Sequence, residues 1–236
     1  MPWEILRLGN VASTQDTARA RVESGDGAGT VVVADTQSEG RGRQGRGWDS
    51  PPGGLYMTAL LEVGSHANLI PLVAGVAVAE TMRDHFGVEA VLKWPNDVLI
   101  EGRKVGGILV DVEWSGDERG VLLLGVGINL NNAIPKHLEE ATSLSEESGE
   151  EIDVEAFLER LLESLDGLLQ KLETDPREVL TKWEGLSETL GRMIVVKDPS
   201  GDVFEGVAES IDYDGALKLD CGGRSIRVLS GTVLGR

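Results

Sequence analysis

The sequence predicts an α+β protein, in which a sheet packs against helices and a small barrel of short strands follows at the C-terminus. Three observations lead to this prediction. Residues 30–35 are rich in β-branched side chains, residues 152–173 carry apolar side chains at helical spacing, and after Gly191 short strand-like runs alternate with Gly, Asp and Pro turns. With 236 residues and 41% hydrophobic content, the chain can form one large core and one small one. We therefore expect two domains, 1–188 and 189–236.

The N-terminal elements begin with a helix. Ser13-Thr14-Gln15-Asp16 fits a capping box, and Ala18 and Val22 then fall on one helical face, so Ser13 taken alone is more often a cap than a ligand. We expect strands at 30–35, 55–63, 88–93, 97–100, 104–113 and 120–130, an apolar helix at 69–86 that ends near Gly87, and a turn at Ser115-Gly116-Asp117.

The C-terminal elements begin with a long helix at 152–173, whose leucines have the spacing of a buried face. Pro176 is favourable in the first turn of a second, shorter helix. We expect the last strands at 193–196, 203–208, 216–219 and 225–229.

Composition narrows the class of protein. The longest apolar stretch, 69–78, contains Pro71 and is too short to cross a bilayer, and the N-terminus has no signal-peptide pattern, so we expect a cytoplasmic protein with no membrane partner. Cys221, the single cysteine, cannot form an internal disulfide and is expected to be a small buried residue. The net charge is -18, and the acid gathers in 139–163, where we expect solvated helix faces that repel nucleic acid.

A loop at 37–48 contains four glycines, three arginines and a tryptophan, although the chain is acidic overall. Gly40, Gly42 and Gly45 match G-x-G-x-x-G, but residues 47–54 do not begin the helix that a dinucleotide site needs. A phosphate-binding P-loop fails as well, because its Lys-Ser/Thr pair is replaced by arginine and glycine. A solvated, disordered segment remains an alternative. The position of the loop between two strand-like runs favours a site for a small anion.

A second group of residues lies at 93–97, where Lys-Trp-Pro-Asn-Asp predicts a tight corner between two strands. Without other evidence, an ordinary turn is the better interpretation. Glycines at 106 and 107 and at 125 and 127 thin two neighbouring strands, and glycine inside a strand often marks the close approach of a ligand or backbone. We therefore expect a slot whose floor is backbone.

These motifs, in this order, resemble the biotin protein ligase family, also called biotin-[acetyl-CoA-carboxylase] ligases. The shared motifs are the Gly-Arg-Gly-Arg-x-Gly-Arg-x-Trp loop, the Lys-Trp-Pro-Asn-Asp corner, the Lys-x-x-Gly-Ile-Leu strand and the Gly-x-Gly-Ile-Asn strand, and the Ser-Thr pair at 13–14 also falls where the family has one. The resemblance covers about residues 5–185 and, more weakly, the C-terminal region.

The resemblance implies a mixed, mainly antiparallel sheet with helices packed on it, similar to that of class II aminoacyl-tRNA synthetases, and an SH3-like C-terminal barrel. Some members carry an N-terminal winged helix that binds an operator. Only twelve residues precede Ser13, so we expect the form without that domain, with no DNA partner. Members of this form often pair through sheet edges, which makes a homodimer our expectation. Gly47 departs from the basic residue that many relatives have before the tryptophan.

The resemblance also implies a reaction. Biotin and ATP would give biotinyl-5'-AMP, and a lysine of a biotin carboxyl carrier protein or domain would then receive biotin. Because biotin and ATP are both anions, fixed cations must offset their repulsion. Lys104 is the expected catalytic residue, supported by Arg43, Arg46 and Lys93.

The expected contacts follow by similarity. Biotin would contact Ser13, Thr14, Gln15, Gln37, Gly40, Arg41, Gly42, Arg43, Lys104 and Gly107. ATP would contact Arg43, Arg46, Trp48, Asn96, Lys104 and Asn129, with Asp97 as a candidate Mg²⁺ ligand. We also expect the loop to become ordered over the adenylate and to exclude water. The three histidines match no motif, and neither the general base of the second step nor a ligand contact from the C-terminal region can be assigned.

Two alternatives stay open from the sequence. A lipoate or octanoate ligase or transferase would share the catalytic fold and the carrier lysine, although the loop and the corner favour biotin. A protein without catalytic activity that binds nucleic acid through the arginine loop is the second alternative. The net charge of -18 and the lack of a broad basic face oppose it.

Overall fold

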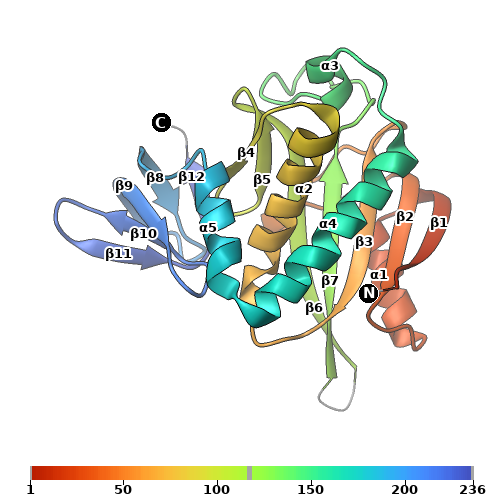
Figure 1. Ribbon diagram of the computed structural model, residues 1–236, viewed down its shortest axis with the longest axis horizontal. Coiled ribbons are helices and arrows are strands. Elements are labelled where there is room, and N and C mark those ends of the chain that lie inside the picture. Colours follow the sequence, from red (N-terminus) through yellow and green to blue (C-terminus); the bar gives the residue numbers. More distant parts are fainter. Residues whose placement is uncertain (1, 116–118, 235–236) are drawn as a thin grey trace.

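A computed structural model describes residues 2–115 and 119–234 of the protein, so Gly116 and Asp117 of the expected turn lie outside the described residues. In this part of the chain, seven strands form the larger of two sheets, in the order β1-β2-β3-β7-β6-β5-β4 (Figure 1). β1 and β2 pair in parallel and the other neighbours are antiparallel. The expected mixed, mainly antiparallel sheet is confirmed. Its strands are β1 (Glu4–Val11), β2 (Thr30–Gln37), β3 (Leu55–Glu62), β4 (Ala90–Lys93), β5 (Asp97–Ile100), β6 (Arg103–Ser115) and β7 (Arg119–Ile128).

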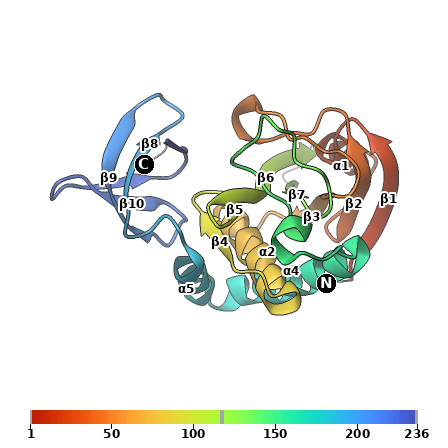
Figure 2. The same ribbon diagram turned by 90° about the horizontal axis from the view of Figure 1, so that it is seen from above.

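Helices cover both faces of this sheet (Figure 2). Three of them, α2 (Ile70–Phe86), α4 (Val154–Thr174) and α5 (Pro176–Leu186), pack on one face and bury the apolar side chains that predicted them. α1 (Thr14–Glu23) lies alone on the opposite face, where Ala18 and Val22 meet Val32 of β2. None of the helices in the described residues is long and apolar enough to cross a membrane.

The ends of the helices follow the residues that the sequence offers. Ser13 caps α1 by accepting a hydrogen bond from the backbone N of Gln15 at 3.2 Å, and Gly87 ends α2 with a left-handed φ of 65°. Pro176 occupies the first turn of α5, as expected. The short helix α3 (Leu144–Ser148) and strand β1 are elements that the sequence patterns did not predict.

The C-terminal unit is a five-stranded antiparallel sheet in the order β11-β10-β9-β8-β12. In the described residues β11 and β12 are its two edges, so the hydrogen-bonded ladder does not close, and the expected barrel is corrected to an open sheet of SH3-like type. β12, which has only three residues, pairs with β8, and β11 pairs with β10, so no backbone hydrogen bonds join the two edge strands in the described residues. The strands are β8 (Met193–Lys197), β9 (Val203–Ile211), β10 (Leu217–Asp220), β11 (Ser225–Val228) and β12 (Thr232–Leu234).

Trp94 joins the two sheets. Its backbone N donates to Oγ1 of Thr189 at 2.9 Å, and its indole Nε1 donates to the carbonyl of Gly215 at 3.2 Å. The side chain is buried, and the peptide bond to Pro95 is cis. The corner between β4 and β5 is therefore attached to the C-terminal sheet as well as to its own strands.

Candidate active site

A cleft of about 740 Å³ lies on the face of the larger sheet that carries α1. Its wall comes from the start of α1, the loop between β2 and β3, the corner between β4 and β5, strands β6 and β7, and residues 231–233 of the C-terminal sheet. Because side chains alternate along a strand, Gly107 and Leu109 of β6 belong to this face. Gly127 and Gly125 of β7 lie directly opposite them.

The loop at 37–48 folds back on itself as an irregular hairpin. Its two sides meet where Trp48 N donates to the carbonyl of Gly40 and Gly42 N donates to the carbonyl of Arg46, each at 2.8 Å. Gly40 has no room for a side chain, because a Cβ there would lie 2.3 Å from the carbonyl oxygen of Trp48. Gly40 thus lets the two sides of the hairpin approach each other, and it does not line the cleft.

One end of the cleft is neutral and polar. Thr14 donates to Oε1 of Gln37 from its backbone N at 2.8 Å and from its hydroxyl at 3.1 Å. The hydroxyl of Thr58 lies 2.9 Å from both Thr14 Oγ1 and Gln15 Oε1. Thr14 and Gln15 are buried, and Ser13 lines the cleft beside them. Buried amides and hydroxyls that fix one another in this way can recognise a neutral polar ligand group.

A chain of charged residues supports this polar end. Gln15 donates from Nε2 to Asp111 at 3.3 Å, and Asp111 in turn forms an ion pair with Arg19 at 3.4 Å. Arg19 also pairs with Asp16 at 3.1 Å, and Asp16 binds Arg41 of the loop at 2.7 Å. Contacts therefore run without interruption from the arginine loop to the amide of Gln15.

Trp48 lies on the expected glycine floor between the two ends of the cleft. A Cβ on Gly127 would be 2.7 Å from the indole Nε1, and one on Gly107 would be 3.1 Å from the indole ring. The Nε1 atom is buried, and no hydrogen-bond partner for it occurs among the described residues. Burying a hydrogen-bond donor without a partner costs free energy, and an unpaired donor beside a cleft is a feature of sites that a ligand completes.

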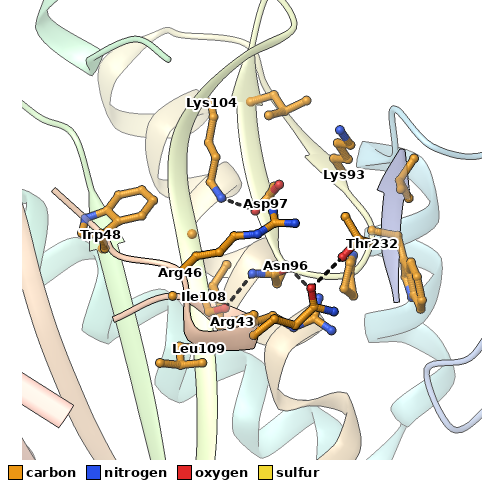
Figure 3. A pocket seen from close by; sticks show the side chains of 18 of the residues that line it. Arg43, Arg46, Trp48, Lys93, Asn96, Asp97, Lys104, Ile108, Leu109 and Thr232 are labelled. Atoms are coloured by element: carbon orange, nitrogen blue, oxygen red, sulfur yellow. Dashed lines mark hydrogen bonds and ion pairs between the residues drawn. The ribbon is translucent and has the colours of Figure 1, made fainter. Parts of the chain in front are cut away.

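The other end of the cleft is cationic (Figure 3). Lys104 pairs with Asp97 at 2.5 Å, and its Nζ lies 5.4 Å from the centre of the Trp48 ring. Lys93 lines the cleft from the end of β4, opposite Asp97 in the strand pairing. Arg46 is exposed, and Figure 3 shows its side chain pointing toward Asp97. Positive charge is thus concentrated at this end.

Arg43 is the arginine of the loop that burial affects most. Its guanidinium donates to Oδ1 of Asn96 at 2.9 Å. Burial lowers the pKa of Arg43, the negative charge of Asp97 opposes this shift, and the positive charge of Arg46 adds to it. Asn96 is held in turn, because its Nδ2 donates to the carbonyl of Ile108 at 2.9 Å. The corner between β4 and β5 therefore holds Arg43 in position through Asn96.

The structure brings together every predicted site residue except Gly40 and Asn129. Asn129 lies behind the wall, where its Nδ2 donates to the carbonyl of Thr142 at 3.0 Å and its Oδ1 accepts from Asn132 at 3.0 Å. Its amide holds the segment after β7 in place. For a metal, no cluster of three or more His, Cys, Asp or Glu side chains occurs within the described ranges. Asp97 supplies one carboxylate, which fits Mg²⁺ when phosphates and water provide the other ligands.

Several residues of the cleft were missed from the sequence. Glu139 and Glu140 line its mouth, so part of the acidic region is cleft wall and not a solvated helix face. Thr58 closes the polar end from β3, and residues 231–233 complete the opposite side. Backbone contacts place Glu140 there, since its carbonyl accepts from Lys104 N at 2.7 Å. No motif marks these positions, because spacing along the chain does not reveal contacts between distant segments.

Comparisons with known proteins identify the relatives of this chain. Residues 9–129 match the model of the biotin/lipoate A/B protein ligase family, and residues 189–234 match the biotin protein ligase C terminal domain. The biotin--[acetyl-CoA-carboxylase] ligase of Mycobacterium tuberculosis is 33% identical over 98% of this chain and 89% of its own length. The bifunctional ligase/repressor BirA of Bacillus subtilis is 34% identical over 89% of this chain and 67% of its own. The biotin protein ligase of Aquifex aeolicus in complex with biotin and ATP superposes with a TM-score of 0.87 at 31% identity, covering 98% of this chain and 97% of that one.

Proposed function

The chain belongs to the biotin/lipoate A/B protein ligase family, and on this premise we propose that it is a biotin protein ligase. The protein activates biotin with ATP to biotinyl-5'-AMP and transfers biotin to a lysine of a biotin carboxyl carrier protein or domain. One observation carries the proposal: a single cleft joins a neutral, hydrogen-bonded end at Thr14 and Gln15 to a cationic end at Lys104 and Arg43.

Biotin fits the cleft in one orientation. Its ureido ring is neutral and offers hydrogen-bond donors and an acceptor, so Ser13, Thr14, Gln15 and Gln37 receive it at the polar end. Its carboxylate then points toward the cations, where Arg41, Gly42 and Arg43 enclose it. Polar groups that are left unpaired reject analogues without the ring, which gives the site its specificity.

The first reaction step needs charge neutralisation more than it needs a protein nucleophile. The carboxylate oxygen of biotin attacks the α-phosphorus of ATP, the new C–O–P bond forms, and pyrophosphate leaves with the electron pair of the broken P–O bond. Lys104 lies between the two reacting anions, and Arg43, Arg46 and Lys93 bind the phosphates. Fixed cations in a cleft stabilise the charge that develops during such a step.

The remaining predicted residues bind the nucleotide. Trp48 stacks on adenine, and the Gly107 face lies beneath the bound ligand. Asn96 holds Arg43 in addition to any contact of its own with ATP. Asn129 lies behind the wall, and the hydrogen bonds of its amide support an indirect role in shaping the nucleotide site. Asp97 would hold Mg²⁺, which supplies charge neutralisation at the phosphates.

The carrier lysine completes the reaction in the second step. Its neutral amine attacks the carbonyl carbon of the mixed anhydride, an amide bond forms with loss of a proton from the amine to water, and AMP leaves with the electron pair of the broken C–O bond. The proposed location is the cytoplasm, where ATP and carrier proteins are available.

We also propose that the protein forms a homodimer through a sheet edge. β6 extends beyond the reach of β5, no strand pairs with its free edge over 109–114 in the described residues, and Val112 and Trp114 are 40% and 65% exposed there.

ATP–pyrophosphate exchange tests the proposal. The wild-type protein should exchange pyrophosphate only when biotin is present, and Lys104→Ala should lose most of this exchange. Lys171→Ala is the control, because Lys171 forms an exposed ion pair with Glu178 on the helical face away from the cleft. Exchange that does not depend on biotin, or an equal effect of the two substitutions, contradicts the proposal.

The lipoate or octanoate alternative has less support. The C-terminal region matches a model specific to biotin protein ligases, and relatives named as biotin ligases cover most of the chain. Thermal unfolding with ATP and either biotin or lipoate separates the two substrates, because a ligand that binds the folded state raises the melting temperature by mass action. A larger rise with lipoate would reverse the assignment.

A further inference from the structure

Arg43 is held by the C-terminal sheet as well as by the larger sheet. Besides its bond to Asn96, the guanidinium donates to Oγ of Ser230 at 3.0 Å and to the carbonyl of Gly231 at 3.3 Å. All three acceptors are neutral oxygens. Because its hydrogen-bond partners are neutral oxygens, the guanidinium is not engaged in a direct ion pair among the described residues and can bind an anionic ligand.

The segment that receives Arg43 is fixed by close packing. Gly231 approaches β8 so closely that a Cβ would lie 2.8 Å from the carbonyl oxygen of Lys197, and the next residue, Thr232, pairs with Lys197 in the sheet. The hydroxyl of Thr232 also donates to Oε1 of Gln44 at 3.1 Å. The tip of the loop therefore has two separate attachments to the same segment.

Arg43 also borders two cavities. A second, smaller cavity of about 170 Å³ lies between the two sheets, and Arg43, Asn96 and Trp94 line both this cavity and the main cleft. Ser230 lines the second cavity. The hydrogen bond from Ser230 therefore holds the guanidinium of Arg43 at the boundary of the two cavities.

We propose that Ser230 is a positioning residue for Arg43, and that with Gly231 and the Gln44–Thr232 bond it fastens the loop to the C-terminal sheet and retains the adenylate in the cleft. This inference rests on the proposed function. It assigns the C-terminal sheet a part in the reaction, because the hydroxyl of Ser230 acts through Arg43 without touching the substrate.

The release of adenylate measures this role. Protein is loaded with biotin and MgATP in the absence of carrier, separated by rapid gel filtration, and assayed over time for free biotinyl-5'-AMP. Ser230→Ala should release the adenylate about five-fold faster than wild type, the factor expected for one lost hydrogen bond. Ser230→Thr should restore retention because it keeps a hydroxyl. Ser225→Ala, an exposed serine of β11 on the same sheet, should behave as wild type.

A second variant keeps the test independent of folding. Gln44 is exposed, so Gln44→Ala removes the other attachment at little risk to the fold, and it should also accelerate release. Equal release by Ser230→Ala, Gln44→Ala and Ser225→Ala, with unchanged melting temperatures, would overturn the inference and leave the proposed function intact. A wild-type protein that forms no adenylate would overturn both.

Discussion

The indole of Trp48 lies directly on Gly127, with its Nε1 2.7 Å from the point where a Cβ of residue 127 would be. Gly127→Ala should therefore displace the indole, because a rigid ring cannot yield by rotating a flexible end. Since base stacking on an aromatic ring contributes about 1–3 kcal/mol, we expect the KM for ATP to rise about ten-fold, with the KM for biotin little changed. Steady-state kinetics of adenylate formation measures both constants.

Gly167→Ala is the control for this prediction. Gly167 lies in α4, and no atom occurs within 4 Å of the added Cβ. The alanine should raise the stability of the helix by about 1 kcal/mol and leave both KM values unchanged. If Gly127→Ala leaves the KM for ATP at the wild-type value, Trp48 does not stack on adenine.

Gly125 has the corresponding relationship to biotin. A Cβ on Gly125 would lie 2.9 Å from Oε1 of Gln15. Gly125→Ala should push the amide away from its position in the polar end and raise the KM for biotin about ten-fold, because a buried hydrogen bond to the ligand is lost. The KM for ATP should stay near the wild-type value. Isothermal titration with biotin alone measures the effect, and unchanged affinity would exclude Gln15 from the biotin site.

Arg19 should influence biotin binding from a distance. Because Arg19 holds Asp111, which in turn holds Gln15, Arg19→Met should loosen the polar end and weaken biotin binding about three-fold, the loss expected when a hydrogen bond is weakened but not removed. Arg21→Met is the matched control, since Arg21 lies on the same helix and pairs with Asp26 away from the cleft. Equal biotin affinities for the two variants would contradict the proposed chain of contacts.

Acid should weaken the C-terminal sheet through Asp212. The backbone N–H of Tyr213 donates to its carboxylate, and Lys218 and Arg227 add positive charge, so the pKa of Asp212 lies below its ordinary value in the folded protein. The unfolded chain then binds the proton more readily, and the stabilisation is present above the ordinary pKa of about 3.9 and is lost as the pH falls through the folded value.

Asp212→Asn tests the sign of this effect. The melting temperature of the wild type should exceed that of Asp212→Asn at pH 7, and the difference should shrink between about pH 5 and pH 3 as the aspartate is protonated. A difference that grows on acidification would show that the folded state raises the pKa.

Local patterns predicted much of this fold. The leucines of α4 and the capping residue Ser13 depend on neighbours a few positions away, so sequence spacing identifies them. β1 was missed because its residues are mostly exposed or half-buried, and an edge strand of this kind lacks the alternation of a strand with one buried face. β12 was missed because three residues are too few to show a pattern.

The residues of the candidate site also fall into two groups, those that sequence motifs predicted and those that only the fold brings together. The glycines of β6 and β7, the arginine loop and Lys104 stand in motifs, so the sequence named them together with the slot between them. Ser230 and Thr232 meet residues of the loop that lie 187 and 188 positions away in the chain, and only the fold brings them together. Asn129 is the converse case, because its motif is present and its side chain lies behind the wall.

The environment of Trp48 makes this residue a natural optical probe. Its indole lies beside the ammonium of Lys104 and its Nε1 lacks a partner among the described residues, whereas the indole of Trp94 donates to Gly215 between the two sheets. A nucleotide that stacks on Trp48 should quench the fluorescence of this indole. Occupancy of the cleft can then be followed in real time without an attached label.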